Sequence, residues 1–89
     1  MPFYVYVLKS QTSGKTYVGH TSNLQYRLQQ HNDPQCNLTL HTKRNRGPWK
    51  LAYHEEYETR AKAMRRERFL KGGHGRDFIK RVILKANNQ

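Results

Sequence analysis

Two short β-like runs separated by turn residues dominate the N-terminal part of the sequence. Strand-forming residues fill the run from Phe3 to Lys9, segment 11–14 (Gln-Thr-Ser-Gly) is typical of a turn, and a second run spans Thr16 to His20. This pattern predicts a β-hairpin. With an even number of loop residues, paired positions have an odd index sum, which places Tyr6 and Tyr17 on one face. An odd, bulged loop would separate them.

The first strand is apolar or aromatic on both faces, as a central strand covered on both sides would be. Its two alternating sets are Phe3, Val5 and Val7, and Tyr4, Tyr6 and Leu8. Gly19 lies near the end of the second strand, where a glycine suggests close approach by a helix or a substrate phosphate.

A helix is predicted directly after the hairpin. Ser22 is a suitable N-cap with Gln25 three positions later, and Leu24, Leu28 and His31 recur at helical spacing. Arg27 lies beside this face, so its cation points toward the hairpin. Because burying an unpaired guanidinium is costly, we expect Arg27 to line a cleft or to meet an anion.

A long segment without strong periodicity follows, from the break at 32–34 (Asn-Asp-Pro) to Trp49. It carries four basic side chains, His41, Lys43, Arg44 and Arg46. A solvated basic loop is the plain interpretation. We favour contact with phosphate backbone, because cations beside a cleft raise local affinity for a polyanion.

The C-terminal half predicts one strand and two helices. Leu51 to Tyr57 alternates, with Leu51, Tyr53 and Tyr57 expected on one face, and Thr59 can cap a helix that stops at segment 72–73 (Gly-Gly). A last helix is predicted over about Asp77 to Ala86. The order β-β-α-β-α-α predicts an α+β fold: a small three-stranded antiparallel sheet flanked by three helices, in a single domain spanning 1–89.

Glu67 is the only acid in the predicted second helix, and it lies within that helix's apolar stripe, close to Ala63, Met64 and Leu70. A structural ion pair with Arg60 or Lys71, one turn to either side, competes with a role as a ligand. The residues alone leave the two interpretations evenly balanced.

The net charge of the chain indicates which kind of molecule it binds. Lys and Arg number 17 against 6 acidic residues, giving +11 and a pI near 10.2. This favours nucleic acid first and an anionic membrane surface second, with solubility alone as the plain alternative. Cys36 is the only cysteine, so an intrachain disulfide is impossible, and it is expected to be an incidental thiol. Without an apolar run of membrane-spanning length or a signal peptide, we expect a cytoplasmic protein without membrane contact.

The segments Tyr4-Val5-Tyr6 and Tyr17-Val18-Gly19, followed by Arg27, His31 and the later Glu67, resemble the GIY-YIG nuclease superfamily, in particular its small standalone members. The resemblance covers about Phe3 to Lys85. One departure is plain, since Tyr4 stands where the first tripeptide has glycine.

The resemblance implies a divalent-metal-dependent endonuclease, or a structure-selective nickase, that hydrolyses DNA phosphodiester bonds. It implies catalytic roles for Tyr6, Tyr17, Arg27 and His31, and it makes Glu67 the ligand of one Mg²⁺ or Mn²⁺ ion, completed by waters and substrate phosphate. Tyr17 would be the general base or would position the water; because tyrosine titrates near 10, this role needs a lowered pKa or help from the metal. We expect these five side chains to converge on one concave surface.

Secondary contacts with nucleic acid are assigned to His20, His41, Lys43, Arg44 and Arg46, with DNA preferred over RNA and no obligate protein partner evident. Two alternatives stay open. One is a non-catalytic nucleic-acid-binding module with the same fold. The other is a basic RNA-binding protein that uses Trp49, Tyr53 and the loop cations.

Overall fold

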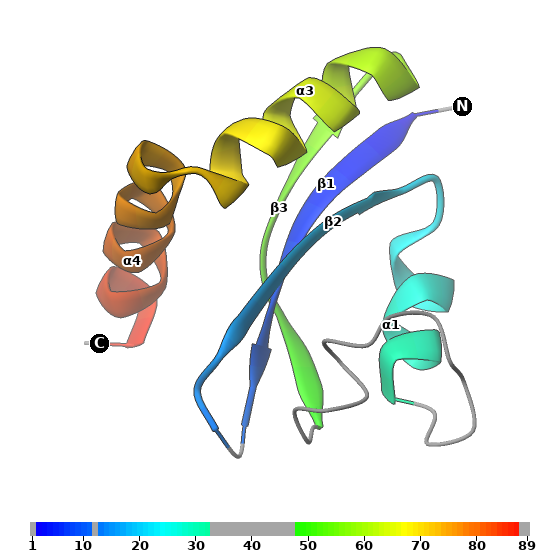
Figure 1. Cartoon of the computed structure of the whole chain (residues 1–89). Coiled ribbons are helices and arrows are strands. Elements are labelled where there is room, and N and C mark those ends of the chain that lie inside the picture. The colour runs from blue at the N-terminus through cyan, green and yellow to red at the C-terminus, as the bar shows by residue number, and fades with distance from the viewer. Residues whose placement is uncertain (1, 12, 33–47, 88–89) are drawn as a thin grey trace.

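The computed structural model describes residues 2–11, 13–32 and 48–87, with side chains described as far as Val82. Three antiparallel strands form a sheet in the order β2-β1-β3. The strands are β1 (Phe3–Ser10), β2 (Thr16–Thr21) and β3 (Trp49–Tyr57), and the helices are α1 (Leu24–Asn32), α3 (Arg60–Lys71) and α4 (Gly73–Asn87). Helix α1 covers one face of the sheet, while α3 and α4 cover the other (Figure 1). The predicted α+β fold is confirmed.

Strand β1 is the central strand, and its two alternating sets of side chains enter two separate cores. Val5 and Val7 pack with Ala63 and Leu70 of α3. On the other face Tyr6 and Leu8 form a second core, and its partly buried members include Leu24 and Leu28 of α1. A central strand with two covered faces therefore explains the near-continuous apolar run of the sequence.

The hairpin has the register that the sequence predicts. Tyr6 pairs with Gly19 and Leu8 pairs with Tyr17, so the index sum is odd. Tyr6 and Tyr17 consequently share the face covered by α1, and their ring centroids lie 6.3 Å apart. The pairing of β1 with β2 thus brings the two tyrosines together.

A bulge in β3 corrects one expectation. Val7 pairs with Tyr53 and Leu8 with Leu51, so Ala52 is an extra residue between the two pairs. The extra residue moves Leu51 to the α1 face, while Tyr53 stays on the α3 face. The prediction that Leu51 and Tyr53 share a face was therefore wrong.

The Glu55 carboxylate of β3 accepts hydrogen bonds that link β3 to α3. Glu55 accepts hydrogen bonds from the hydroxyls of Tyr53 and Tyr57, and from Arg66 of α3 through Nε at 2.9 Å and an Nη atom at 3.1 Å. Burial alone would raise the pKa of Glu55, but these hydrogen bonds outweigh it and lower the pKa below its usual value. Because Arg66 precedes Glu67, this contact also fixes how α3 presents the next residue.

The helix boundaries follow partly from the sequence. The N-cap of α3 is Thr59 as predicted, since its side chain accepts a hydrogen bond from the Lys62 amide at 3.2 Å. For α1 the predicted N-cap was wrong: Asn23, not Ser22, accepts from the Tyr26 amide at 3.0 Å.

Helix α4 begins at Gly73, earlier than the predicted start near Asp77. The glycines discouraged an earlier start, but Gly75 is buried where the two helices meet. An added Cβ there would lie 2.2 Å from the Phe69 carbonyl oxygen and 2.3 Å from the Leu70 Cα. Gly75 is therefore needed for the close approach of α4 to α3.

Several expectations fall on residues outside the described part of the chain. They concern the loop side chains His41, Lys43, Arg44 and Arg46, and the cysteine, Cys36. Among the helices that are described, none is both long enough and apolar enough to cross a membrane.

Candidate active site

The centre of the site is the Tyr6 hydroxyl, held between two side chains of α1. Nε of Arg27 donates to its oxygen at 3.3 Å, and Nε2 of His31 lies 2.9 Å from the same oxygen. Since Arg27 can only donate, the hydroxyl proton remains available for His31. Tyr6 is 1% exposed and His31 is 6% exposed, so this small network is nearly sealed from solvent.

Tyr17 lies beside this network at the free edge of the sheet. Its ring centroid is 4.9 Å from that of His31. Gly19 makes room for both tyrosines, because an added Cβ would lie 2.6 Å from the Tyr6 hydroxyl oxygen and 3.1 Å from Cε1 of Tyr17. The close approach expected at Gly19 thus comes from a tyrosine side chain and not from a helix.

Glu67 reaches the same edge from the opposite layer. Helix α3 covers the face that α1 does not, yet the Glu67 carboxylate lies 2.8 Å from Nδ1 of His20 on edge strand β2. Nζ of Lys71 is 3.4 Å from the other carboxylate oxygen and 6.0 Å from the Tyr17 ring centroid. Glu67 therefore lies at edge strand β2, and Lys71 is placed between it and Tyr17.

The environment keeps both tyrosine hydroxyls protonated near neutral pH. Burial raises the pKa of Tyr6 to about 12, although the Arg27 hydrogen bond opposes the rise. Burial also raises the pKa of Tyr17, where the Arg27 charge lowers it and the Glu67 charge raises it. The influence of Glu67 on both hydroxyls agrees with its position at the same edge.

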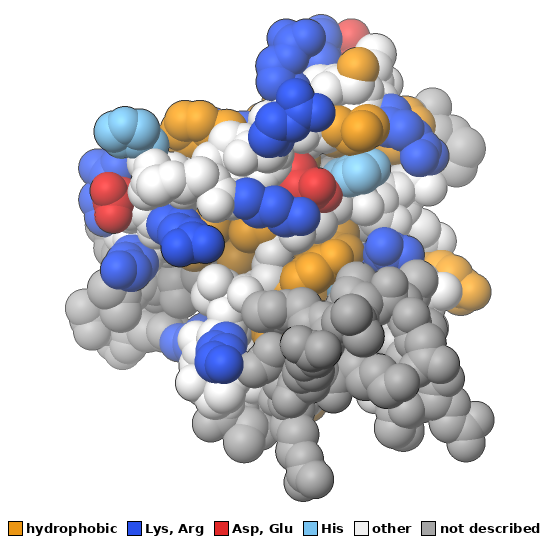
Figure 2. All heavy atoms as spheres, viewed as in Figure 1, with side chains coloured by type: hydrophobic (Ala, Val, Ile, Leu, Met, Phe, Trp, Pro, Cys, Tyr) orange, Lys and Arg blue, Asp and Glu red, His pale blue; other side chains and the backbone are white. Residues whose placement is uncertain are grey.

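Figure 2, viewed as Figure 1 with β2 in front, shows Lys and Arg side chains around an acidic side chain and a histidine. The structure brings Tyr6, Tyr17, Arg27 and His31 into one cluster on the α1 face of the sheet, and it places Glu67 of α3 at the neighbouring edge strand β2. The five side chains do not share one concave surface as expected, because Tyr6 and His31 are buried beneath it.

One feature of this cluster did not emerge from the sequence. His20 was expected to contact phosphate, but its Nδ1 bonds to Glu67, 47 positions away. The ion pair of Glu67 with Lys71, which helical spacing suggested, is present at 3.4 Å. Arg60, the other suggested partner, stacks instead over the Phe3 ring at 5.2 Å.

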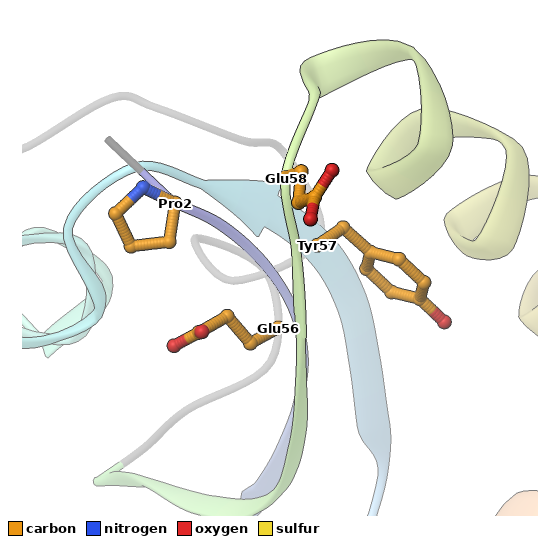
Figure 3. A pocket seen from close by; sticks show the side chains of 4 residues that line it. All are labelled: Pro2, Glu56, Tyr57 and Glu58. Atoms are coloured by element: carbon orange, nitrogen blue, oxygen red, sulfur yellow. The ribbon is translucent and has the colours of Figure 1, made fainter.

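One hollow away from the tyrosine cluster is unsuited to a polyanion. A hollow at the end of β3 is lined by Pro2, Glu56, Tyr57 and Glu58 (Figure 3). Its two carboxylates repel phosphate. The RNA-binding alternative needs Trp49 and Tyr53 exposed for stacking on bases. Trp49 is 2% exposed, and Tyr53 is partly buried and donates its hydroxyl hydrogen bond to Glu55, so neither ring is available.

Comparison with known proteins identifies the family of the chain. The family model described as the GIY-YIG catalytic domain matches residues 2–81, and the chain belongs to this family. It is similar to UPF0213 protein CPE1444 of Clostridium perfringens, with 40% identity over 68 residues that cover 76% of this chain and 69% of the relative. The solution NMR structure of UPF0213 protein BH0048 from Bacillus halodurans is similar in fold, with a TM-score of 0.54 and 30% identity; the match covers 96% of this chain and 86% of that one.

Proposed function

We propose that this protein is a divalent-metal-dependent endonuclease, or a structure-selective nickase, that hydrolyses DNA phosphodiester bonds. The observation that carries the proposal is the cluster of Tyr6, Tyr17, Arg27 and His31 on one face of the sheet, with Glu67 at the adjoining edge strand β2, where it bonds to His20. Membership of a nuclease family and a charge of +11 support a nucleic-acid substrate.

In this proposal Arg27 binds the reacting phosphate. Its Nε is used by Tyr6, whereas its terminal nitrogens have no partner among the described side chains, so they can bind phosphate oxygens. Tyr6 and His31 are too buried to offer much surface to DNA. We therefore assign them positioning roles: they hold the guanidinium in place and hold a proton at the Tyr6 hydroxyl.

Tyr17 is only partly buried and lies beside Tyr6, whose hydroxyl Arg27 contacts. Because its pKa is raised, the hydroxyl orients the attacking water or a phosphate oxygen as a donor, and a tyrosinate base is disfavoured in the protein alone.

With one carboxylate as its protein ligand, a Mg²⁺ or Mn²⁺ ion at this site would need waters and substrate phosphate to complete its coordination. Glu67 would hold it: its side chain is 20% exposed, and Lys71, which is 52% exposed, can swing aside from its oxygen. His20 bonds to the other oxygen, as partners of ligating carboxylates commonly do. Such an ion supplies positive charge that stabilises the transition state and activates water.

One observation favours the alternative of a binding module without turnover. Both oxygens of Glu67 already have cationic or hydrogen-bonding neighbours, and the described residues include no group of three or more His, Cys, Asp or Glu that could hold a metal. In that case Glu67 serves as a structural ion pair.

The test is incubation of the pure protein with labelled branched, flapped, single-stranded and duplex DNA, and with matched RNA, in Mg²⁺ or Mn²⁺ against EDTA. Cleavage should require the metal and should disappear in Arg27→Ala. A parallel salt titration of DNA affinity should show a steep fall. Steep, salt-sensitive binding with no cleavage of any substrate would favour the binding module.

A further inference from the structure

A groove adjoins the candidate active site on the side of the α3–α4 junction. It has a volume of about 370 Å³, within the range of about 300–1,000 Å³ typical of small-ligand sites. Tyr17, Lys71 and Arg76 lie along it. Its apolar lining is shallow, because Val18 and Ile79 are 7% and 6% exposed and Leu70 is fully buried, so the ring of Tyr17 is the main apolar surface open to a ligand. Figure 2 shows hydrophobic side chains framed by Lys and Arg in front of this junction.

The groove carries two cations, and one of them lacks local compensation. Lys71 pairs with Glu67, which it shares with His20, whereas Arg76 forms no ion pair within the described part of the chain. Arg76 lies in the first turn of α4, where its backbone N–H donates a hydrogen bond to the Gly72 carbonyl oxygen at 2.9 Å, and this turn carries no acidic residue. An anionic group is therefore favoured here.

The Tyr17 ring makes a nucleotide a better occupant than a simple anion. Grooves that bind single-stranded nucleic acid combine cations, which follow the backbone, with aromatic or apolar surfaces, against which bases rest. Lys71 and Arg76 supply the cations, while the Tyr17 ring supplies the surface.

We propose that this groove holds one unpaired nucleotide next to the reacting phosphate, with its own phosphate between Lys71 and Arg76. The inference rests on the proposed function, because Tyr17 belongs to both the groove and the candidate active site. A base lying against the Tyr17 ring cannot pair at the same time, so the substrate strand is single at this position. Flaps, frayed ends and loops are then preferred over continuous duplex.

The test is DNA affinity measured in EDTA, where no cleavage occurs, for a labelled single strand and for a blunt duplex of the same sequence. Arg76→Ala is compared with Arg81→Ala, which removes the same charge from an exposed position of the same helix outside the groove. Alanine is a strong helix former, so both variants should fold.

Arg76→Ala should weaken single-strand binding by up to about fivefold and should lower the slope of log affinity against log salt by about 0.7. Arg81→Ala should change neither, and duplex binding should respond equally to the two variants. In NMR spectra of the wild type, the Val18 and Ile79 methyl signals should shift on addition of a dinucleotide.

The proposal would be overturned if Arg76→Ala and Arg81→Ala changed the affinity for the single strand equally. It would also be overturned if Arg76→Ala changed the affinities for single strand and duplex equally, or if the wild type did not bind single strands. Failure of the protein to cleave DNA with metal would refute the proposed function but would leave these binding results standing. Normal cleavage with an unaltered Arg76→Ala affinity would refute the groove alone.

Discussion

Replacing Glu67 by glutamine separates a metal ligand from a structural ion pair. The change keeps the side-chain volume and removes the charge, so the rate of DNA cleavage should fall by at least about a hundredfold. Removing even a residue that only hydrogen-bonds to a metal ligand lowers metal affinity or activity by about 10–100-fold. DNA binding should persist or tighten slightly, since phosphate no longer meets a carboxylate without its cation.

The structure indicates a small effect of this change on stability. Lys71 is 52% exposed and lies one turn away at 3.4 Å, so its pair with Glu67 contributes at most about 0.5 kcal/mol after screening. The His20 contact at 2.8 Å is worth about 1–2 kcal/mol, but glutamine can still hydrogen-bond to Nδ1 and recover part of it. A net loss of about 1 kcal/mol corresponds to a melting temperature about 4–8 °C lower for a domain of this size.

The assay is a thermal melt beside single-turnover cleavage on one preparation of each protein. Glu58→Gln is the matched control, because it makes the same charge change at an exposed site outside the cluster of Tyr6 and Tyr17. Specific activity that is unchanged in Glu67→Gln, whatever its melting temperature, would refute the metal assignment. It would leave Glu67 as an ion pair.

Three further changes test the surroundings of the site. Gly19→Ala places a Cβ 2.6 Å from the Tyr6 hydroxyl oxygen, so it should cost about 1–3 kcal/mol and reduce cleavage; a normal melt and rate would contradict the close packing. Tyr6→Phe leaves the Arg27 guanidinium unanchored, so the cleavage rate should fall more than DNA affinity does, and equal losses would argue against a positioning role. Because folding lowers the pKa of Glu55, its carboxylate contributes fully to the free energy of unfolding above its unfolded pKa of 4.5, and this contribution is lost as the pH falls through the lower folded pKa. In Glu55→Gln the free energy of unfolding, measured with urea at a series of pH values, should therefore fall less steeply on the acid side. A pH dependence equal to that of the wild type would refute this.

The sequence by itself determines the local elements of this fold. Alternating aromatic and apolar residues define β1, an even loop sets the register of Tyr6 and Tyr17, and Thr59 marks the start of α3. Each of these depends on neighbouring residues: the alternation of side chains in a strand, or the cap of a helix end. Family resemblance then selects the five site residues, whose roles stay predictions.

Tertiary structure decides what local patterns leave open. Ser22 and Asn23 are both good caps, and the choice depends on how far β2 continues, which is to Thr21. The bulge at Ala52 depends on the pairing of β3 with β1, so alternation within β3 could not reveal it.

The position of Glu67 is decided in the same way. Helical periodicity shows which side of α3 faces the sheet, but it does not show which face of the sheet the helix covers. The structure places α3 opposite α1, with β2 as the edge strand between them. Glu67 therefore contacts His20 on that edge strand, and Lys71 lies between Glu67 and the Tyr17 ring.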